Sequence, residues 1–203
     1  MIYFFATSNK HKFEEAKDIL TVPLIAENVD ITEIQGSIED IVIKKAIDAY
    51  GIIKPRYPEP ICVITDDVSL EIKMLNNFPG VYVKEFISNG FENLEKILNI
   101  HDKSATAICA IGICYDSPGQ TQSYTTKCFK AVVNGQLTFN RPIHNVNAFG
   151  FDKIFVPDGM EKTYAECNFT DKNKVSHRRK ALKKLEDFLK IQDFCNSINK
   201  KKI

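Results

Sequence analysis

The sequence lacks an excess of charge of either sign, because 27 lysines and arginines stand against 26 aspartates and glutamates, a formal net charge of +1. This balance removes the usual electrostatic argument for a dedicated nucleic-acid or membrane-surface binder, so any anion site must be local. No apolar run approaches the length of a transmembrane helix, and the apolar residues 1–5 are too few for a signal sequence. We therefore expect a cytoplasmic protein without a membrane or nucleic-acid partner.

The six cysteines form no CxxC pair, and most lie in apolar runs such as residues 105–109. This pattern favours reduced thiols in the core over a structural zinc site or a disulfide framework. The sequence also lacks internal repeats, low-complexity linkers and any break in composition. At 203 residues, of which 44% are hydrophobic, the chain is long enough for one substantial core, and we expect a single domain over residues 1–203.

Alternating apolar and polar segments predict a sheet whose strands are joined by helices. The expected strands cover residues 2–7, 24–28, 61–64, 70–75, 105–115, 121–133 and 154–156. The expected helices follow the loop after the first strand, run for about four turns from Ile38, span 91–100, and begin after Ser176. Residues 116–120 have the composition of a hairpin connection. We therefore predict an α/β fold with a mixed sheet flanked by helices and two lobes around a central groove.

A polar segment separates the first expected strand from its helix, and it consists of Thr7, Ser8, Asn9, Lys10, His11 and Lys12. A helix N-terminus presents unpaired backbone N–H groups and a partial positive charge, so small polar residues and lysines there can cradle a phosphate chain. The segment lacks the glycines and the Gly-Lys-Ser/Thr ending of a Walker loop, which leaves P-loop NTPase chemistry unsupported. A plain helix cap with solvated lysines is the alternative interpretation.

Three acidic residues follow expected strands. Glu33 comes after the second strand, and Asp66 and Asp67 stand at the expected end of the third. Carboxylates clustered at strand ends suit Mg²⁺, which shares the phosphates of a substrate, and one acid can hold the metal while another activates water. The alternative is a turn or cap at a strand end. Lys45 falls among apolar positions of the second helix, so it is either a semi-buried anion contact or a snorkelling lysine.

Two segments in the C-terminal part carry groups suited to recognising a base. Residues 149–152 place phenylalanines beside a glycine, and an accessible ring of this kind can stack on a base. Residues 172–180 contain a histidine and arginines, whose N–H groups are donors for the carbonyl oxygens of a ring. The alternatives for this basic run are a solvated helix start and a local nucleic-acid contact, and the balanced overall charge disfavours the second.

Taken in order, these segments resemble the inosine triphosphate pyrophosphatase family, and the resemblance spans nearly the whole chain. The matching pieces are Ala6-Thr7-Ser8-Asn9 with Lys12, Glu33, Lys45, Asp66-Asp67-Val68-Ser69-Leu70, Pro79-Gly80-Val81-Tyr82-Val83-Lys84, Phe149-Gly150-Phe151-Asp152 and Ser176-His177-Arg178. Residues 158–166 are similar to the eukaryotic branch of the family. One departure is Val68, which stands where the family usually has serine or threonine, so we expect a hydroxyl contact near the metal site to be missing.

The resemblance implies a mixed, twisted sheet with a second lobe, a substrate groove between the lobes, and a homodimer. It implies hydrolysis of ITP, dITP and XTP to the nucleoside monophosphate and pyrophosphate, which clears these deaminated purine nucleotides from the nucleotide pool. The implied cofactor is Mg²⁺, bound by Glu33 and Asp67, and the implied catalytic residues are Asp67, Lys12 and Lys45. Two alternatives stay open, a pyrophosphatase for pyrimidine or modified nucleotides and a non-catalytic nucleotide-binding protein.

The resemblance also implies a set of substrate contacts. This set comprises Thr7, Ser8, Asn9, Lys10, His11, Lys12, Lys45, Asp67, Val68, Lys84, Phe149, Gly150, Phe151, Asp152, Lys172, Ser176, His177 and Arg178. Within it Phe149 is expected to stack on the base, and His177 and Arg178 are expected to lie closest to the 6-oxo group. Donors that fit a 6-oxo oxygen face another donor when adenine enters, which would explain the rejection of ATP.

Overall fold

The computed structural model describes residues 1–88, 95–96, 102–117, 124–139 and 148–200, and for 193–200 it describes the course of the helix only. The middle layer is a seven-stranded sheet. Six of its strands follow the order β2-β1-β3-β5-β6-β7, and the seventh, β4, pairs with β3 outside this order. The strands are β1 (Ile2–Ala6), β2 (Leu24–Glu27), β3 (Ile61–Ile72), β4 (Pro79–Gly80), β5 (Ser104–Asp116), β6 (Tyr124–Leu137) and β7 (Phe155–Pro157). The expected mixed sheet is confirmed, because β1 pairs in parallel with its neighbours and the other pairings are antiparallel.

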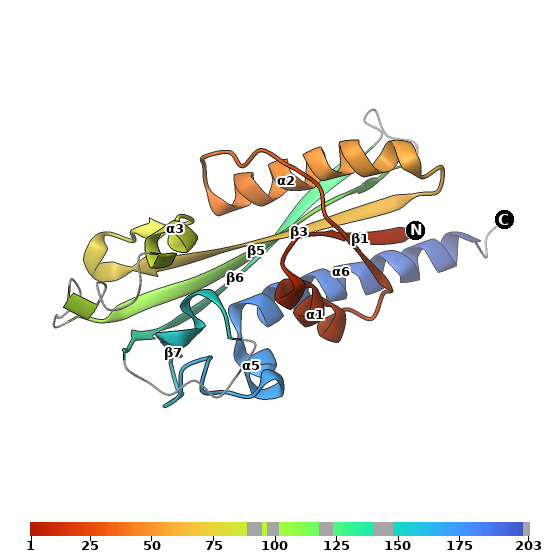
Figure 1. Ribbon diagram of the computed structural model, residues 1–203. Helices are drawn as coiled ribbons and strands as arrows, with labels where there is room; N and C mark the ends of the chain where they lie inside the picture. Colours follow the sequence, from red (N-terminus) through yellow and green to blue (C-terminus); the bar gives the residue numbers. More distant parts are fainter. Residues whose placement is uncertain (89–94, 97–101, 118–123, 140–147, 201–203) are drawn as a thin grey trace.

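Helices cover both faces of the sheet (Figure 1). On one face α2 (Ile38–Ile53) lies along β3 and β5, and on the other α1 (Lys10–Ile19) and α6 (His177–Lys200) pack against each other. The shorter elements are α3 (Val83–Ser88), α5 (Phe169–Val175) and the 3-10 turns η1 (Lys54–Arg56), η2 (Lys73–Leu75) and η3 (Gly150–Lys153). In the part of the chain that the structure describes, no helix is both long and apolar enough to cross a bilayer.

The connections to the two neighbours of β1 run over opposite faces of the sheet, and this arrangement places a crevice at the end of that strand. From β1 the chain passes through α1 to β2 on one side, and later through α2 to β3 on the other side. The two helices lie on opposite faces of the sheet (Figure 1). In open α/β sheets ligands bind at such a point, outside the carboxyl ends of the strands. Because β1 ends at Ala6, the polar residues 7–12 follow directly at this crevice.

The third strand corrects the prediction. Separate strands over 61–64 and 70–75 are expected, whereas β3 runs without a break from Ile61 to Ile72 and pairs with β5 along its whole length. Asp66 and Asp67 therefore lie inside a strand and not at its end. They still belong to the crevice, because the ladder between β1 and β3 stops at Ile64. Two consecutive acids usually interrupt a strand, and here cations from other elements compensate them, which local patterning cannot show.

Side chains alternate along β3 between the two faces of the sheet. The even-numbered residues from 62 to 72 face the side of α1 and α6, and the odd-numbered ones from 61 to 71 face the side of α2. Because of this alternation, Asp66 and Asp67 point to opposite faces.

The backbone of α2 comes close to β5 because Gly112 has no side chain, and a Cβ there would lie 2.4 Å from the Val42 carbonyl oxygen.

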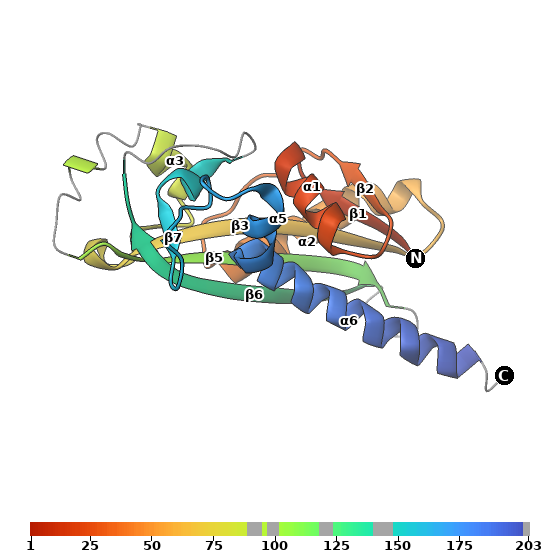
Figure 2. The ribbon, with the colours of Figure 1, turned by 90° about the horizontal axis from the view of Figure 1, so that it is seen from below.

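Two packed groups of side chains share the α6 face of the sheet. One joins α1 and α6 to the first part of the strands, and the other joins η3 and β7 to residues farther along, such as Leu70, Ala107 and Phe155. Figure 2 shows β7 and α3 at one end of the long strands and α1 and β2 at the other. This arrangement matches the predicted two lobes.

The other expected elements lie close to their predicted positions, with β7 over Phe155–Pro157 in place of 154–156. Of the helix predicted over 91–100, only residues 95–96 are described, and they are helical. Residues 118–120 of the predicted hairpin connection, and 121–123 of the strand that follows, lie outside the described residues.

Candidate active site

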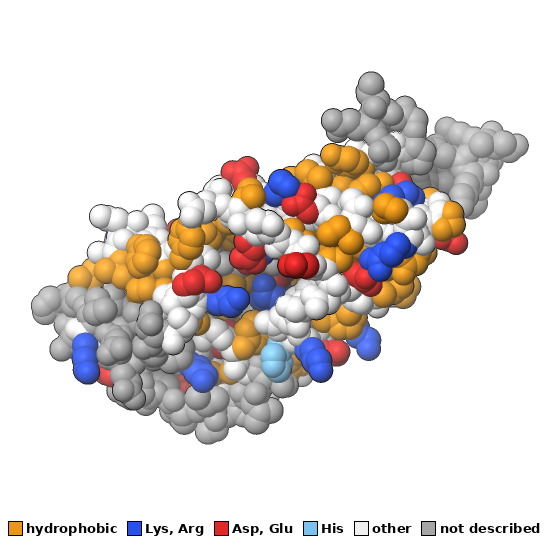
Figure 3. Space-filling view, turned by 45° about the horizontal axis from the view of Figure 1, so that its top comes forward, with side chains coloured by type: hydrophobic (Ala, Val, Ile, Leu, Met, Phe, Trp, Pro, Cys, Tyr) orange, Lys and Arg blue, Asp and Glu red, His pale blue; other side chains and the backbone are white. Residues whose placement is uncertain are grey.

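A hollow lies between the two packed groups, beside the end of β1. The predicted site residues that line it are Asn9, Lys12, Asp67, Val68, Lys84, Phe149, Gly150, Phe151, Asp152, His177 and Arg178. Val81, Val83 and Ile87 add an apolar wall that the prediction does not include. Figure 3 shows acidic and basic side chains gathered around a depression in the middle of the molecule. Residues from both ends of the sequence thus meet in one place.

The remaining predicted residues stand outside the lining, and they are Thr7, Ser8, Lys10, His11, Glu33, Lys45, Lys172 and Ser176. The Thr7 hydroxyl accepts a hydrogen bond from the Asn9 N–H at 3.1 Å. Asn9 Oδ1 in turn accepts from the backbone N–H groups of His11 and Lys12, at 3.0 and 3.2 Å. Ser8 and Lys10 are exposed. Asn9 therefore caps α1 and also faces the hollow, so the helix-cap interpretation and a binding role are compatible.

Lys45 joins two carboxylates beside the hollow. Its Nζ lies 2.6 Å from Glu33 Oε1 and 2.7 Å from Asp67 Oδ2. The Glu33 side chain is 72% exposed and that of Lys45 16%, so the cluster opens to solvent at Glu33. The hydrogen bond from Lys45 lowers the pKa of Glu33, and Lys84 and Lys12 contribute to the same shift. Burial alone would lower the pKa of Lys45, but Asp67 and Glu33 raise it and keep the ammonium charged.

Glu33 and Asp67 fit a divalent cation, because oxygens of both carboxylates converge on one positively charged atom. A hard cation such as Mg²⁺ prefers oxygen ligands and is usually held by one or two carboxylates together with substrate phosphates. Within the described ranges, no three His, Cys, Asp or Glu side chains are grouped so that they could hold a metal. The pair therefore suits a metal that binds together with a substrate better than a closed structural site.

A buried ion-pair network lies behind the hollow. Glu15 accepts from Lys172 at 2.7 Å and from Arg178 at 2.5 Å. Arg178 also donates to Asp66 at 2.7 Å, and Lys172 to Asp152 at 2.7 Å. All five side chains are buried. Two predicted substrate contacts, Lys172 and Arg178, are thus held by carboxylates from three different elements.

Opposing effects set the ionisation of these acids. Burial alone would raise the pKa of Asp66, but Arg178 and Lys12 hold it well below its ordinary range. Burial likewise opposes ionisation of Glu15, yet the two cations that it binds lower its pKa. For Asp152 burial outweighs the attraction of its lysine partner, and its pKa is raised. Glu15 and Asp66 are therefore the two acids of the network whose ionised form their cation partners favour.

The network corrects one expectation and adds one residue. Asp66 does not share a carboxylate cluster with Asp67, since it faces α1 and α6, where Lys12 Nζ lies 2.5 Å from its Oδ1. Glu15 is absent from the predicted set. It falls three residues after Lys12 and four before Ile19, on the stripe of α1 that faces the core. An acid on such a stripe needs a buried cation, and this signal could have identified it.

Phe149 presents a partly buried ring to the hollow. Lys172 Nζ lies 4.7 Å from its centroid and Arg178 Cζ 5.2 Å. The His11 ring stacks on Phe149 with centroids 5.5 Å apart and an interplanar angle of 18°. These contacts place two cations and one imidazole around the ring that was predicted to receive the base.

His177 supplies a neutral imidazole to the hollow. It is 3% exposed, and its Nδ1 has no hydrogen-bond partner among the described atoms. Burial and the nearby Arg178 lower its pKa well below 6.5. The adjacent Ser176 lies outside the lining, and its hydroxyl accepts the Arg179 N–H at 3.1 Å. His177 thus lines the hollow with a buried ring nitrogen that has no partner among the described atoms, whereas Ser176 caps the start of α6.

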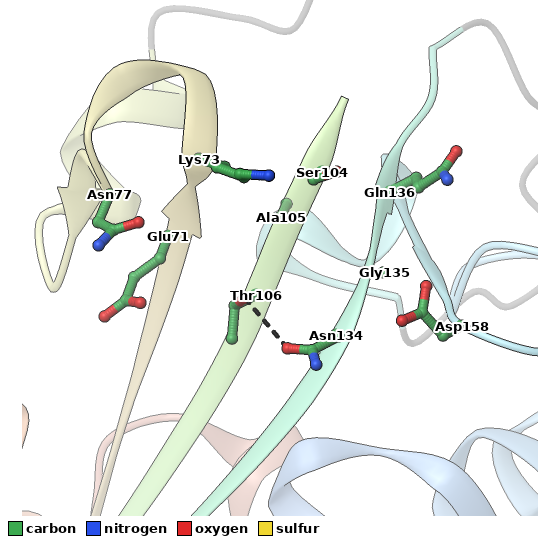
Figure 4. Close-up of a pocket in the computed structure, with 10 residues that line it drawn as sticks. All are labelled: Glu71, Lys73, Asn77, Ser104, Ala105, Thr106, Asn134, Gly135, Gln136 and Asp158. Carbon is green, nitrogen blue, oxygen red and sulfur yellow. Dashed lines mark hydrogen bonds between the residues drawn. The ribbon is translucent and has the colours of Figure 1, made fainter. Parts of the chain in front are cut away.

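A second hollow lies at the far ends of β3, β5 and β6 and contains none of the predicted site residues (Figure 4). Glu71, Thr106 and Asn134 occupy neighbouring positions on the three strands, and Thr106 Oγ1 lies 3.3 Å from Asn134 Oδ1. The lining includes the carboxylates of Glu71 and Asp158, a single lysine and no aromatic ring. This hollow therefore suits a nucleotide poorly.

The chain is similar to known proteins over most of its length. Residues 3–188 match the Ham1 family. A protein named inosine triphosphate pyrophosphatase from Scheffersomyces stipitis is 36% identical, over 93% of this chain and 97% of the relative. A protein of the same name from Phaeosphaeria nodorum is 38% identical, over 91% of this chain and 92% of the relative.

Solved structures show the same similarity. The Ham1 protein of Staphylococcus aureus superposes with a TM-score of 0.74 at 27% identity, over 95% of this chain and all (100%) of that one. A HAM1 protein from Coxiella burnetii gives a TM-score of 0.73 at 25% identity, over 94% and 99% of the two chains. With sequence relatives and solved structures both matching almost end to end, the chain belongs to the Ham1 family.

Proposed function

We propose that the chain hydrolyses deaminated purine nucleoside triphosphates, such as ITP, dITP and XTP, to the nucleoside monophosphate and pyrophosphate. The proposal follows the name of its relatives, inosine triphosphate pyrophosphatase. The observation that carries it is the convergence of Glu33, Lys45 and Asp67 beside a hollow that also contains Phe149. A triphosphate needs the charged cluster and a purine needs the aromatic ring, and both lie at one site.

The triphosphate is proposed to lie between the start of α1 and a group of lysines. Asn9 and Lys12 line the hollow at the helix terminus, where backbone N–H groups give a partial positive charge. Lys12, Lys45 and Lys84 all lie near enough to Glu33 to lower its pKa. These cations would stabilise the negative charge that collects on the phosphate oxygens as pyrophosphate leaves.

The proposed chemistry is attack of water on the α-phosphorus, with Asp67 accepting the proton that the water loses. The bond from the α-phosphorus to the oxygen that bridges it to the β-phosphate breaks, and pyrophosphate leaves with that oxygen. Asp67 suits this role because it lines the hollow and its carboxylate is held by Lys45. Mg²⁺, held by Glu33 and Asp67, would neutralise phosphate charge.

The base is proposed to stack on Phe149 and to present its 6-oxo oxygen to His177 and Arg178. Arg178 is fixed by Glu15 and Asp66, so its N–H groups do not need to reorganise when a base binds. A 6-amino group brings a donor to the same place and would leave the protein donors unpaired. This pairing rule is our reason for preferring ITP over ATP as substrate.

We also propose a cytoplasmic homodimer, on the basis of the family resemblance alone. Sedimentation velocity of the purified chain tests the dimer. A single species with the mass of two chains is expected, and a monomer at concentrations well above those of the assay would contradict it.

The deciding experiment measures pyrophosphate release from ITP, XTP, GTP, ATP, dTTP and UTP, each with magnesium and with EDTA. Turnover of ITP and XTP far above GTP and ATP, lost in EDTA, is the expected result. Turnover of dTTP or UTP instead would keep the chemistry and overturn the base assignment. No turnover of any nucleotide would favour the non-catalytic nucleotide-binding alternative.

A further inference from the structure

His11 is an exposed residue whose ring packs on the proposed base-stacking residue. Its imidazole stacks on Phe149 with ring centroids 5.5 Å apart and an angle of 18° between the ring planes. Among the described residues, it is the aromatic partner of Phe149. Stacked aromatic pairs are worth more than the area they bury, so this contact favours one orientation of the Phe149 ring.

The position of His11 on α1 shows from which side it approaches the Phe149 ring. His11 and Glu15 are four residues apart, so they lie above one another on the same face of the helix. Glu15 binds Lys172, whose Nζ lies 4.7 Å from the Phe149 centroid. His11 and Lys172 therefore approach the ring from the side of α1. Neither lines the hollow, whereas Phe149 and Arg178, whose Cζ lies 5.2 Å from the same centroid, both do.

The backbone alone does little to fix the ring. Phe149 precedes the short turn η3, and Gly150 has a positive φ of 59°. The Phe149 N–H donates to Asp152 Oδ2 at 3.2 Å, which anchors the main chain at this point. No strand of the sheet includes Phe149, so the orientation of its side chain depends on the groups packed against it.

We propose that His11 is a positioning residue for base recognition, because its imidazole stacks on the Phe149 ring and holds in place the ring that receives the purine. The proposal rests on the proposed function, since it deepens the same base site. The contribution comes from the aromatic ring of His11 and not from its charge. A side chain that keeps an aromatic ring at position 11 should therefore replace it, and one that keeps only a positive charge should not.

The test measures the Kd of inosine monophosphate by calorimetry for the wild type and for His11→Ala, His11→Phe and His11→Lys. We expect His11→Ala and His11→Lys to weaken binding about 2- to 10-fold, and His11→Phe to restore it. Lys17→Ala, an exposed change on the same helix, serves as the matched control. In ITP turnover the first two changes should raise KM and leave kcat nearly unchanged, which a general loss of structure would not do.

A fluorescent variant separates a residue that holds the ring in place from one that merely occupies the place of the base. The chain has no tryptophan, so His11→Trp introduces a single reporter on Phe149. If residue 11 holds the ring in place, inosine monophosphate should not shift the emission to the red. A red shift would mean that the base displaces the side chain into solvent, and it would overturn the proposal.

The remaining outcomes distinguish this inference from the proposed function. Unchanged or tighter binding in His11→Ala, in a wild type that hydrolyses ITP, overturns the inference and leaves the function intact. A wild type that binds inosine monophosphate without hydrolysing ITP overturns the function, and the Kd series still decides the inference. A wild type that does not bind the monophosphate overturns the inference, and ITP turnover then decides the function separately.

Discussion

Asp66 and Asp67 are neighbours in the chain, but their carboxylates bind cations on opposite faces of the sheet. Asp66 contacts Arg178 of α6 at 2.7 Å, and Asp67 contacts Lys45 of α2 at 2.7 Å. Alternation along a continuous strand causes this separation. Asp66 is buried with its partners, whereas the Asp67 side chain keeps 23% of its surface exposed. The same chemical change at the two positions should therefore have different consequences.

Asp67→Asn should abolish turnover and leave the fold largely intact. The amide cannot accept the proton from water, and we expect a loss in kcat of about 100-fold or more. Steady-state kinetics with ITP measures the loss, and thermal unfolding checks the fold. A near-normal rate would remove Asp67 from the mechanism.

Asp66→Asn is the matched comparison, and its main effect should be on stability. The change leaves Arg178 and Lys12 without their shared carboxylate, and breaking a buried pair costs roughly 3–5 kcal/mol. Urea unfolding measures the free energy of unfolding of both variants. The expectation fails if Asp66→Asn is as stable as Asp67→Asn.

Glu33→Gln should raise the magnesium concentration needed for half-maximal rate. Glu33 is the more exposed carboxylate of the pair, so its loss should change the unfolding temperature little. A magnesium titration of ITP turnover gives the half-maximal concentration, and Glu14→Gln, an exposed change on α1, is the control. An unaltered magnesium requirement would exclude Glu33 as a metal ligand.

Phe149→Ala should weaken substrate binding through loss of stacking, which is worth about 1–3 kcal/mol per base. We expect the loss mainly in KM, because the ring lies on the base and not at the reacting phosphate. Phe149→Tyr keeps the aromatic face and should bind nearly as the wild type does. An unchanged KM in Phe149→Ala would contradict the stacking assignment.

The buried His177 should make stability depend on pH. Its pKa in the folded protein lies well below the ordinary value of 6.5, mainly because of burial. Below pH 6.5 the unfolded chain gains a proton at this residue and the folded protein does not, so stability falls as pH falls. The slope from this residue approaches about 1.4 kcal/mol per pH unit.

Urea unfolding at a series of pH values on both sides of 6.5 measures this slope. His177→Gln should flatten the curve below 6.5. Equal slopes in the wild type and His177→Gln would show that His177 accepts a proton in the folded state.

Much of the fold follows from local patterning, because short strands such as β1 and β7 are compact apolar runs. Residues 2–6 are such a run, and they form the buried β1. Lys45 also stood out, since a lysine among apolar helical positions needs an anionic partner or a path to solvent. The structure places it between Glu33 and Asp67.

The rest depends on contacts between distant segments. The continuity of β3 could not be predicted, because Asp66 is stabilised inside the strand by Arg178, which lies 112 residues further along the chain. The stack of His11 on Phe149 likewise joins the two ends of the chain. Such pairings carry no periodic signal, and the family resemblance gave the role of Arg178 without Glu15, one of the two carboxylates that bind it.

The long strands bear on how the groove can close. β3 and β5 pair without interruption from Cys62 opposite Tyr115 to Ile72 opposite Ala105, and β6 extends the ladder beside them. This continuous ladder lies under both walls of the hollow, so we expect the sheet to stay rigid and not to act as a hinge. Closure over a nucleotide must therefore come from movement of small elements packed on the sheet, such as α3 and η3, or from elastic twisting of the sheet.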